Sequence, residues 1–162
     1  MGQPWVVGAT CGVPFSSSTC DTARYGTASA IRKLDTTGSK LLVARAFGGG
    51  SRGPGSGTFR DHASGIAIDA NDSAWIVGQD LSGTVPTTPG AIQPKRPFPV
   101  SSELTNVGYA IKASSTGDLV YGTYLGNDHG DTITSVAVDA SGTLYFALNY
   151  KVTALRQLAI IT

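Results

Sequence analysis

Two stretches of the sequence carry the same pattern of residues, and they lie 70 positions apart. Residues 61–79 read DHASGIAIDANDSAWIVGQ, and residues 131–149 read DTITSVAVDASGTLYFALN. In each copy a short alternating run ends in aspartate, a polar turn follows, and an aromatic residue lies near the start of a second run. Alternation with a period of two, interrupted by turn-forming residues, is typical of a β-hairpin. The sequence therefore predicts a β-hairpin that occurs twice.

Further strands are predicted on either side of these hairpins. Two more pairs of apolar runs flank glycine-containing turns, at 28–35 with 41–47 and at 108–114 with 119–125. Near the N-terminus, the WVVG of residues 5–8 matches the WIVG of the first hairpin. The final segment, 151–162, is predicted to be a strand rather than a short amphipathic helix because it is rich in β-branched residues.

The fold class predicted from this spacing is all-β, in units of four antiparallel strands. Units of several dozen residues built from short strands are typical of solenoids and propellers, because each unit buries one face against its neighbour. Residues 1–60 would form an incomplete unit, residues 61–126 a complete one, and residues 127–162 a second incomplete one, all within a single domain.

Composition narrows the classes of function. Hydrophobic residues make up 41% of the chain, enough for a core, while charged residues make up only 14%, well below the average of about 25%. The net charge of +1 shows no bias toward polyanions, so nucleic acid is not a predicted partner. Without an apolar run of about 18 residues, no membrane insertion is expected. The first ten residues lack the features of a signal peptide.

Four segments of the sequence carry a resemblance to a known family. They are GIAIDANDSAWIVG (65–78), VPTTPGAIQ (85–93), YAIKASSTGDLVYGTYLG (109–126) and DTITSVAVDASGTLY (131–145). The chain from about residue 31 onward resembles the bacterial SBBP family, whose repeats are associated with seven-bladed β-propellers. The resemblance implies four-stranded blades around a central axis and an exported or surface protein of unassigned activity. The family brings no catalytic residue set with it.

The resemblance also implies that the chain is an incomplete propeller. The family pattern runs over many tandem blades, whereas this sequence holds about two and a half. Unpaired sheet edges favour aggregation, so closure by association into a cyclic homo-oligomer is one expectation. Ten predicted strands per chain would give two chains twenty strands, enough for five blades. The alternative is a fragment of a longer protein.

Two equivalent loops hold the best candidates for chemistry. The loop before the first hairpin contains Asp61 and His62, and the loop before the second contains Asp128, His129 and Asp131. If these loops share one rim of a propeller, the five side chains could hold a divalent metal, calcium or zinc, or act as an acid/base cluster. Alternatively, the aspartates bind loop backbone and the histidines face solvent.

Four further residues are candidates for ligand contacts or for a disulfide. Arg52 lies in the glycine-rich segment GGGSRGPGSG (48–57), which fits two enzyme motifs but lacks the helix that both require; Arg52 remains a candidate contact for an anionic ligand. Trp75 is a candidate for stacking on a ligand, although most aromatic residues are expected to fill the space between blades. Cys11 and Cys20 are predicted to form a disulfide, the alternative being two unpaired thiols.

Two functions follow as hypotheses. The first is an extracellular or cell-surface module for binding or scaffolding, which contacts a glycan or protein ligand through its rim loops. The second is a small hydrolase for an ester, phosphoester or glycoside, with its chemistry in the Asp/His loops.

Overall fold

The computed structural model describes residues 2–11, 27–49, 61–97, 105–127, 130–149 and 156–161. This part of the chain is all-β and contains no helix, as predicted. The final segment contains a strand, again as predicted. The strands are β1 (Trp5–Cys11), β2 (Thr27–Leu34), β3 (Leu41–Phe47), β4 (His62–Ile68), β5 (Ala74–Asp80), β6 (Val107–Ala113), β7 (Leu119–Leu125), β8 (Thr132–Val138), β9 (Leu144–Asn149) and β10 (Arg156–Ile161).

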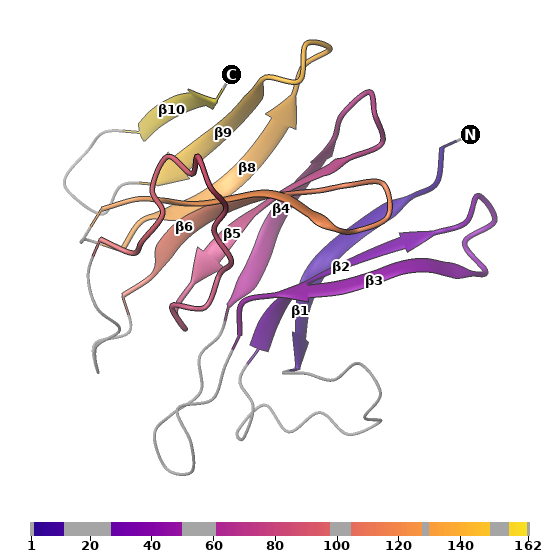
Figure 1. Ribbon diagram of the computed structural model, residues 1–162, viewed down its shortest axis with the longest axis horizontal. Coiled ribbons are helices and arrows are strands. Elements are labelled where there is room, and N and C mark those ends of the chain that lie inside the picture. The colour runs from indigo at the N-terminus through magenta and orange to yellow at the C-terminus, as the bar shows by residue number, and fades with distance from the viewer. Residues whose placement is uncertain are drawn as a thin grey trace.

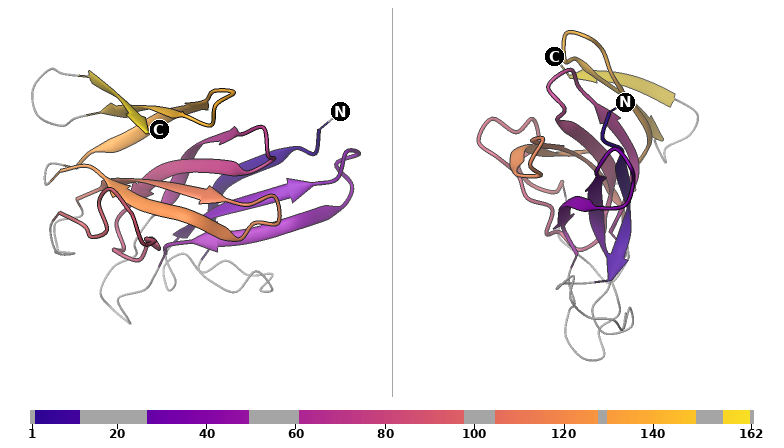
Figure 2. Two further views of the ribbon diagram at one scale, coloured as in Figure 1. Left: turned by 45° about the horizontal axis from the view of Figure 1, so that its top comes forward. Right: turned by 90° about the vertical axis from the view of Figure 1, so that its right-hand side faces the viewer.

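These strands form three antiparallel sheets that follow one another in the order of the chain (Figures 1 and 2). The first sheet has the order β1-β2-β3, the middle sheet β4-β5-β6-β7 and the third β10-β9-β8. The four-stranded sheet therefore spans the segment predicted to be the complete unit. Its first strand, β4, contacts β1 of the first sheet and β8 of the third.

The two hairpins that the sequence predicts to be equivalent have the same register. In the first, Gly65 is paired with Val77, and in the second, Ser135 is paired with Ala147, an offset of 70 on both strands. Both hairpins also carry an irregularity at the same place, just before these pairs. The equivalence of the hairpins thus extends from the sequence pattern to the backbone pairing.

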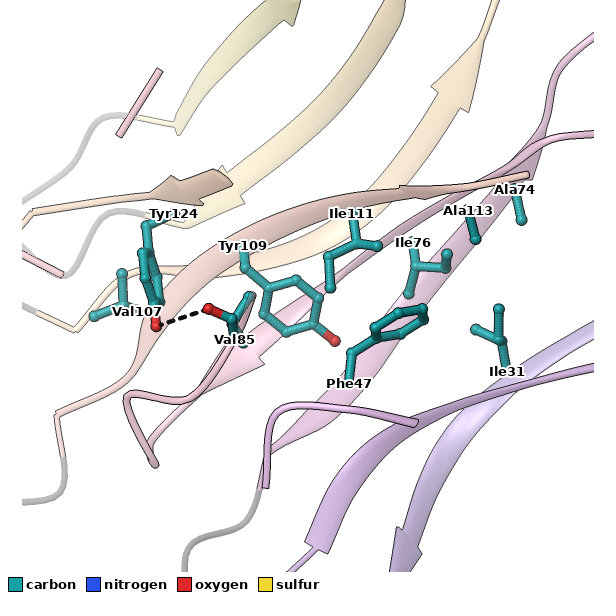
Figure 3. Close-up of a cluster of buried hydrophobic side chains, with 10 residues drawn as sticks. All are labelled: Ile31, Phe47, Ala74, Ile76, Val85, Val107, Tyr109, Ile111, Ala113 and Tyr124. Carbon is teal, nitrogen blue, oxygen red and sulfur yellow. Dashed lines mark hydrogen bonds between the residues drawn. The ribbon is translucent and has the colours of Figure 1, made fainter. Parts of the chain in front are cut away.

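The two central strands of the middle sheet, β5 and β6, are buried on both faces, which explains why both are mainly apolar. Along β5, Ala74 and Ile76 pack toward the first sheet, and Trp75 and Val77 pack toward the third. Figure 3 shows the first of these two clusters, whose members are Ile31, Phe47, Ala74, Ile76, Val85, Val107, Tyr109, Ile111, Ala113 and Tyr124. The second cluster contains Trp75, Val77, Ala110, Leu125, Ile133, Leu144, Phe146 and Leu148.

Aspartate side chains shape the hairpin turns. Asp69 Oδ1 accepts hydrogen bonds from the backbone N–H groups of Asn71 and Ser73, both at 2.9 Å. Asp139 does the same for Ser141 and Thr143, also at 2.9 Å. Each aspartate thus accepts hydrogen bonds from backbone N–H groups that a tight reversal leaves unpaired.

The proline-rich segment after β5 covers the outer edge of β7. The N–H of Thr88 donates to the carbonyl of Gly122 at 3.1 Å, and the N–H of Tyr124 donates to the carbonyl of Gln93 at 3.0 Å. A Cβ atom at Gly122 would lie 2.2 Å from the Pro86 carbonyl oxygen, so this close approach requires glycine. The segment thus protects an edge that would otherwise be free to pair with another chain.

Asp72 joins the middle sheet to the first. Its carboxylate accepts a hydrogen bond from Trp5 Nε1 at 3.0 Å and forms an ion pair with Lys33 Nζ, which also lies over the Trp5 ring. Burial raises the pKa of Asp72, but the hydrogen bonds from Lys33 and Trp5 outweigh that effect and lower it. Asp72 adopts a left-handed backbone conformation with φ of 59°, which is uncommon outside glycine but which aspartate tolerates better than most residues.

The equivalent position in the second hairpin is Gly142, with φ of 89°. A glycine suits the turn but has no carboxylate to offer Trp75, which is the equivalent of Trp5. Trp75 Nε1 is accordingly buried without a hydrogen-bond partner in the structure's described portion. Its neighbour Lys112 pairs instead with Asp69, at 2.8 Å. The two junctions between sheets therefore use different polar contacts.

Substituting Asp72→Asn should lower the free energy of unfolding by about 1–2 kcal/mol, because it leaves the ammonium of Lys33 buried without its anionic partner. The figure is below that for a fully buried pair, since the Asp72 side chain is 46% exposed. Urea unfolding followed by circular dichroism measures the change.

The matched control is Asp118→Asn, which removes the exposed ion pair with Arg45 and should cost less than about 0.5 kcal/mol. Equal effects of the two substitutions would show that Asp72 does not join the sheets in this way.

Candidate functional site

Asp61 lies just before β4 and is completely buried. Its Oδ1 atom accepts hydrogen bonds from the N–H groups of Leu81 at 2.7 Å and Ser82 at 3.0 Å. Its Oδ2 atom accepts from Gly49 N–H at 2.6 Å and from Ser82 Oγ at 2.5 Å. One carboxylate thus connects the end of β3, the start of β4 and the loop after β5. This is the structural role that the sequence offered as the alternative to catalysis.

A second buried carboxylate, Asp80, lies beside Asp61 and was not singled out from the sequence. Asp80 accepts hydrogen bonds from Gly83 N–H at 3.0 and 3.1 Å and pairs with Arg96 Nε at 3.4 Å. Ser82 Oγ lies within hydrogen-bond distance of both carboxylates, 2.5 Å from Asp61 and 3.1 Å from Asp80. A hydroxyl has a single proton and can donate it to only one of them at a time.

Burial and neighbouring charges change the protonation of Asp80. Burial raises the pKa of Asp80 to about 6, the charge of Asp61 adds to the increase, and the guanidinium of Arg96 opposes it. Burial also raises the pKa of the nearby hydroxyls of Tyr109 and Tyr124. Tyr109 donates its proton to Ser29 Oγ at 2.5 Å, so this polar cluster reaches the first sheet.

Asp131 is the equivalent of Asp61 in the third sheet, and it too is completely buried. Its Oδ2 atom accepts a hydrogen bond from Asn127 N–H at 2.6 Å, which repeats the contact between Asp61 and Gly49. Its Oδ1 atom is buried without a hydrogen-bond partner within the described ranges. Backbone binding by both aspartates is therefore confirmed.

His62, the first residue of β4, is half-buried and lies opposite Gln79 in the ladder. Its Nε2 atom is 3.2 Å from Gln79 Nε2, and Gln79 Oε1 accepts a hydrogen bond from Asn106 Nδ2 at 2.5 Å. His62 therefore belongs to a polar chain that runs along the ends of the strands. No group of three or more His, Cys, Asp or Glu side chains suited to a metal ion occurs among the residues that the structure describes.

Several predicted site residues lie outside the described residues, namely Arg52, Asp128, His129 and Cys20, together with the side chain of Cys11. The disulfide, the anion contact and the participation of His129 in a metal or acid/base cluster therefore stay predictions. Within the described part, Asp61 and His62 are adjacent, as expected, but Asp61 is committed to backbone and Ser82 contacts.

Trp75 is 7% exposed and lies between the middle and third sheets. Its ring contacts Tyr121 edge-on, with centroids 5.9 Å apart, and Lys112 Nζ lies 5.4 Å from its centroid. The ring is thus unavailable for stacking on a ligand. Trp75 follows the expectation for most of the aromatic residues, which is to fill the space between sheets.

No protein-family model matches the chain, and no curated protein matches it. The SBBP resemblance therefore stays a hypothesis that rests on the motifs quoted above. The described part of the chain contains no helix of the length and hydropathy needed to cross a membrane.

Protonation of Asp80 should make the protein more stable at mildly acidic pH. The carboxyl has a pKa of about 6 in the folded chain against 3.8 in its ordinary state, so the folded state binds the proton more tightly. This contribution is fully present below about pH 4 and is lost as pH rises through 6, with a size of at most about 3 kcal/mol.

The measurement is the free energy of unfolding by urea between pH 4 and 7. In the wild type this free energy should decrease as the pH rises from 4 to 7. The Asp80→Asn variant should not show the decrease. The Asp118→Asn variant, in which an exposed carboxylate is replaced, should still show it. An unchanged pH slope in Asp80→Asn would rule out Asp80 as the titrating group.

Proposed function

We propose that the protein is a binding or scaffolding module of β-propeller type, extracellular or at the cell surface of a bacterium, rather than an enzyme. The stacking of the sheets in chain order supports the proposal, because neighbouring blades of a propeller pack in this way. The buried positions of Asp61 and Asp131 support a structural role for the two aspartates that the hydrolase hypothesis would use. No contact among the described residues favours the hydrolase.

A comparison of equivalent residues carries the proposal that the module closes by association. Ile76 of β5 is completely buried, because the first sheet packs against it. Val6 of β1 is its equivalent in the first sheet, and it is 49% exposed. A further sheet packed beside Val6 would give the first sheet the environment that the middle sheet already has. Such a sheet would come from another copy of the chain, giving a cyclic homo-oligomer.

The proposed partners are accordingly further copies of the chain and, through the loops at the rim, a protein or glycan ligand. Loops that a rigid scaffold holds in place are the usual position for such contacts. The low charge of the chain suits uncharged or weakly charged partners. Metal binding by the Asp/His loops is not needed for this function.

Light scattering coupled to size-exclusion chromatography tests the association. The mass should exceed that of one chain and should fall on dilution, and Val6→Lys should lower it at a given concentration by placing a charge in the contact. The matched control is Val120→Lys, because Val120 is similarly exposed, at 53%, but lies in the middle sheet. A single-chain mass at every concentration would contradict the proposed self-association.

A further inference from the structure

We propose that the buried carboxylates of Asp61 and Asp80 form a pH-sensitive switch, which holds residues 81–96 in place at mildly acidic pH and releases them more readily at neutral pH. Two further side chains complete the switch, those of Ser82 and Arg96. All four belong to one chain, so the switch is independent of the proposed self-association and of any ligand.

The first part of the switch fixes the beginning of the segment. The N–H groups of Leu81 and Ser82 donate to Asp61 Oδ1 at 2.7 and 3.0 Å. Asp61 Oδ2 accepts from Gly49 N–H at 2.6 Å, so the same carboxylate is bound to the chain just after β3. Thr84 Oγ1 adds a second contact at this point by donating to the Gly49 carbonyl at 3.0 Å. The beginning of the segment is therefore held against the first sheet.

Arg96 fixes the other end of the segment. Its Nη2 atom donates to the Thr105 carbonyl at 2.8 Å, and its Nη1 atom donates to the Leu81 carbonyl at 3.5 Å. Its Nε atom lies 3.4 Å from Asp80 Oδ2, and both side chains are buried. The guanidinium thus joins the end of the segment to its beginning, and Asp80 is the acidic partner in that contact.

Between these two ends the segment packs on β7. Val85 is buried, and its carbonyl accepts a hydrogen bond from the Tyr124 hydroxyl at 3.4 Å (Figure 3). Further along, Thr88 N–H donates to the Gly122 carbonyl, and Tyr124 N–H donates to the Gln93 carbonyl. Release of both ends would weaken this cover and leave the outer edge of β7 free to pair.

Two hydroxyl groups connect the buried carboxylates to the surface. Neither Asp61 nor Asp80 is exposed. Ser82 Oγ, which lies within hydrogen-bond distance of both carboxylates, is also 2.6 Å from Thr84 Oγ1, and Thr84 is an exposed residue. A hydroxyl can accept and donate a hydrogen bond at the same time. The carboxylates can therefore exchange protons with solvent while the segment stays closed.

The titratable groups that face Asp80 come from several elements. They are Asp61 before β4, Arg96 within the segment, Tyr109 of β6 and Tyr124 of β7. Burial raises the pKa of both tyrosines, so they stay protonated at acidic and neutral pH. His62 lies on the other face of the middle sheet, because it is paired with Gln79, and Gln79 and Asp80 are successive residues of one strand.

The charge of Asp80 sets the direction of the pH effect. Burial raises its pKa to about 6, the charge of Asp61 adds to the increase, and Arg96 opposes it. In an opened segment the carboxyl group lies in water and has its ordinary pKa of 3.8. The closed form therefore binds the proton more tightly, and this advantage is lost as the pH rises through 6. The difference between the two values allows opening to become up to about 100-fold more frequent at neutral pH.

Hydrogen exchange of backbone N–H groups in the full chain tests the switch. It is measured by NMR between pH 4 and 7 and corrected for the intrinsic exchange rate. The N–H groups of Thr88 and Tyr124, which join the segment to β7, should lose protection by at least about tenfold as the pH rises. They should also exchange at least about tenfold faster than those of Ile76 and Ile111, which are paired inside the middle sheet and report global unfolding.

Two variants identify the titrating group. In Asp80→Asn the side chain cannot ionise, so the protection of Thr88 should no longer depend on pH. The matched control is His62→Gln, because histidine ordinarily changes charge in the same pH range. This variant should keep the pH dependence of the wild type. Protection that does not change with pH in the wild type, or that still changes with pH in Asp80→Asn, would overturn the inference.

Arg96→Gln keeps the test independent of the folding of Asp80→Asn. Because the guanidinium opposes the raised pKa of Asp80, its removal should move the midpoint of the pH dependence to higher pH. Loss of a purely structural contact would instead lower protection without moving the midpoint. The exposed Arg45, which pairs with Asp118, provides the control Arg45→Gln, with no expected change.

The exchange rates also show whether the segment opens by itself. If Thr88 and Tyr124 exchange at the rate of Ile76 and Ile111 at every pH, the segment opens only when the whole chain unfolds, and the proposed switch is wrong. An unchanged midpoint in Arg96→Gln would contradict it as well. Neither result would affect the proposed function, which is tested by the mass of the assembly.

Discussion

The carboxylate of Asp61 is the interaction on which the arrangement of the first two sheets depends. It accepts four hydrogen bonds while completely buried, and three of them come from backbone N–H groups of loops that belong to no ladder. Each buried backbone N–H group without a partner destabilises the fold by about the free energy of a lost hydrogen bond. The Asp61 side chain provides a partner for three such groups. The same residue type at Asp131 repeats one of these contacts in the third sheet.

The carboxylate of Asp80 lies beside that of Asp61, and its negative charge is destabilised there more than Arg96 stabilises it. Burial of Asp80, together with the charge of Asp61, favours the protonated form of Asp80, and the guanidinium of Arg96, which pairs with Asp80, only partly opposes this. The serine hydroxyl between them cannot donate to both, whatever its orientation. The geometry resembles the carboxylate pairs of catalytic sites, yet it is sealed from solvent and consists largely of turn contacts. It is better understood as part of the scaffold.

The junctions between sheets show how equivalent positions diverge. At the junction of the first and middle sheets, Asp72 occupies a strained turn position and supplies a carboxylate to Trp5 and Lys33. At the next junction Gly142 relieves the strain but leaves Trp75 Nε1 unsatisfied within the described residues. The turn with Asp72 therefore has contacts to the neighbouring sheet but a less favourable backbone conformation, and the turn with Gly142 has the reverse. This difference is seen only when the neighbouring sheets are considered together with each hairpin.

The sequence by itself determined the strands, their turns and the offset of 70 between the hairpins, because these depend on local alternation and on aspartate, asparagine and glycine at reversals. It also offered the backbone-binding role of Asp61 and Asp131 as an alternative. Only the tertiary structure shows the donors of that role, since those at Gly49, Leu81 and Ser82 reach Asp61 from segments distant in sequence. Burial of Trp75 and the Asp80–Arg96 pair likewise depend on how segments distant in sequence pack together. The spacing of residues along the chain predicts local strands and turns, but it does not predict which segments pack against one another.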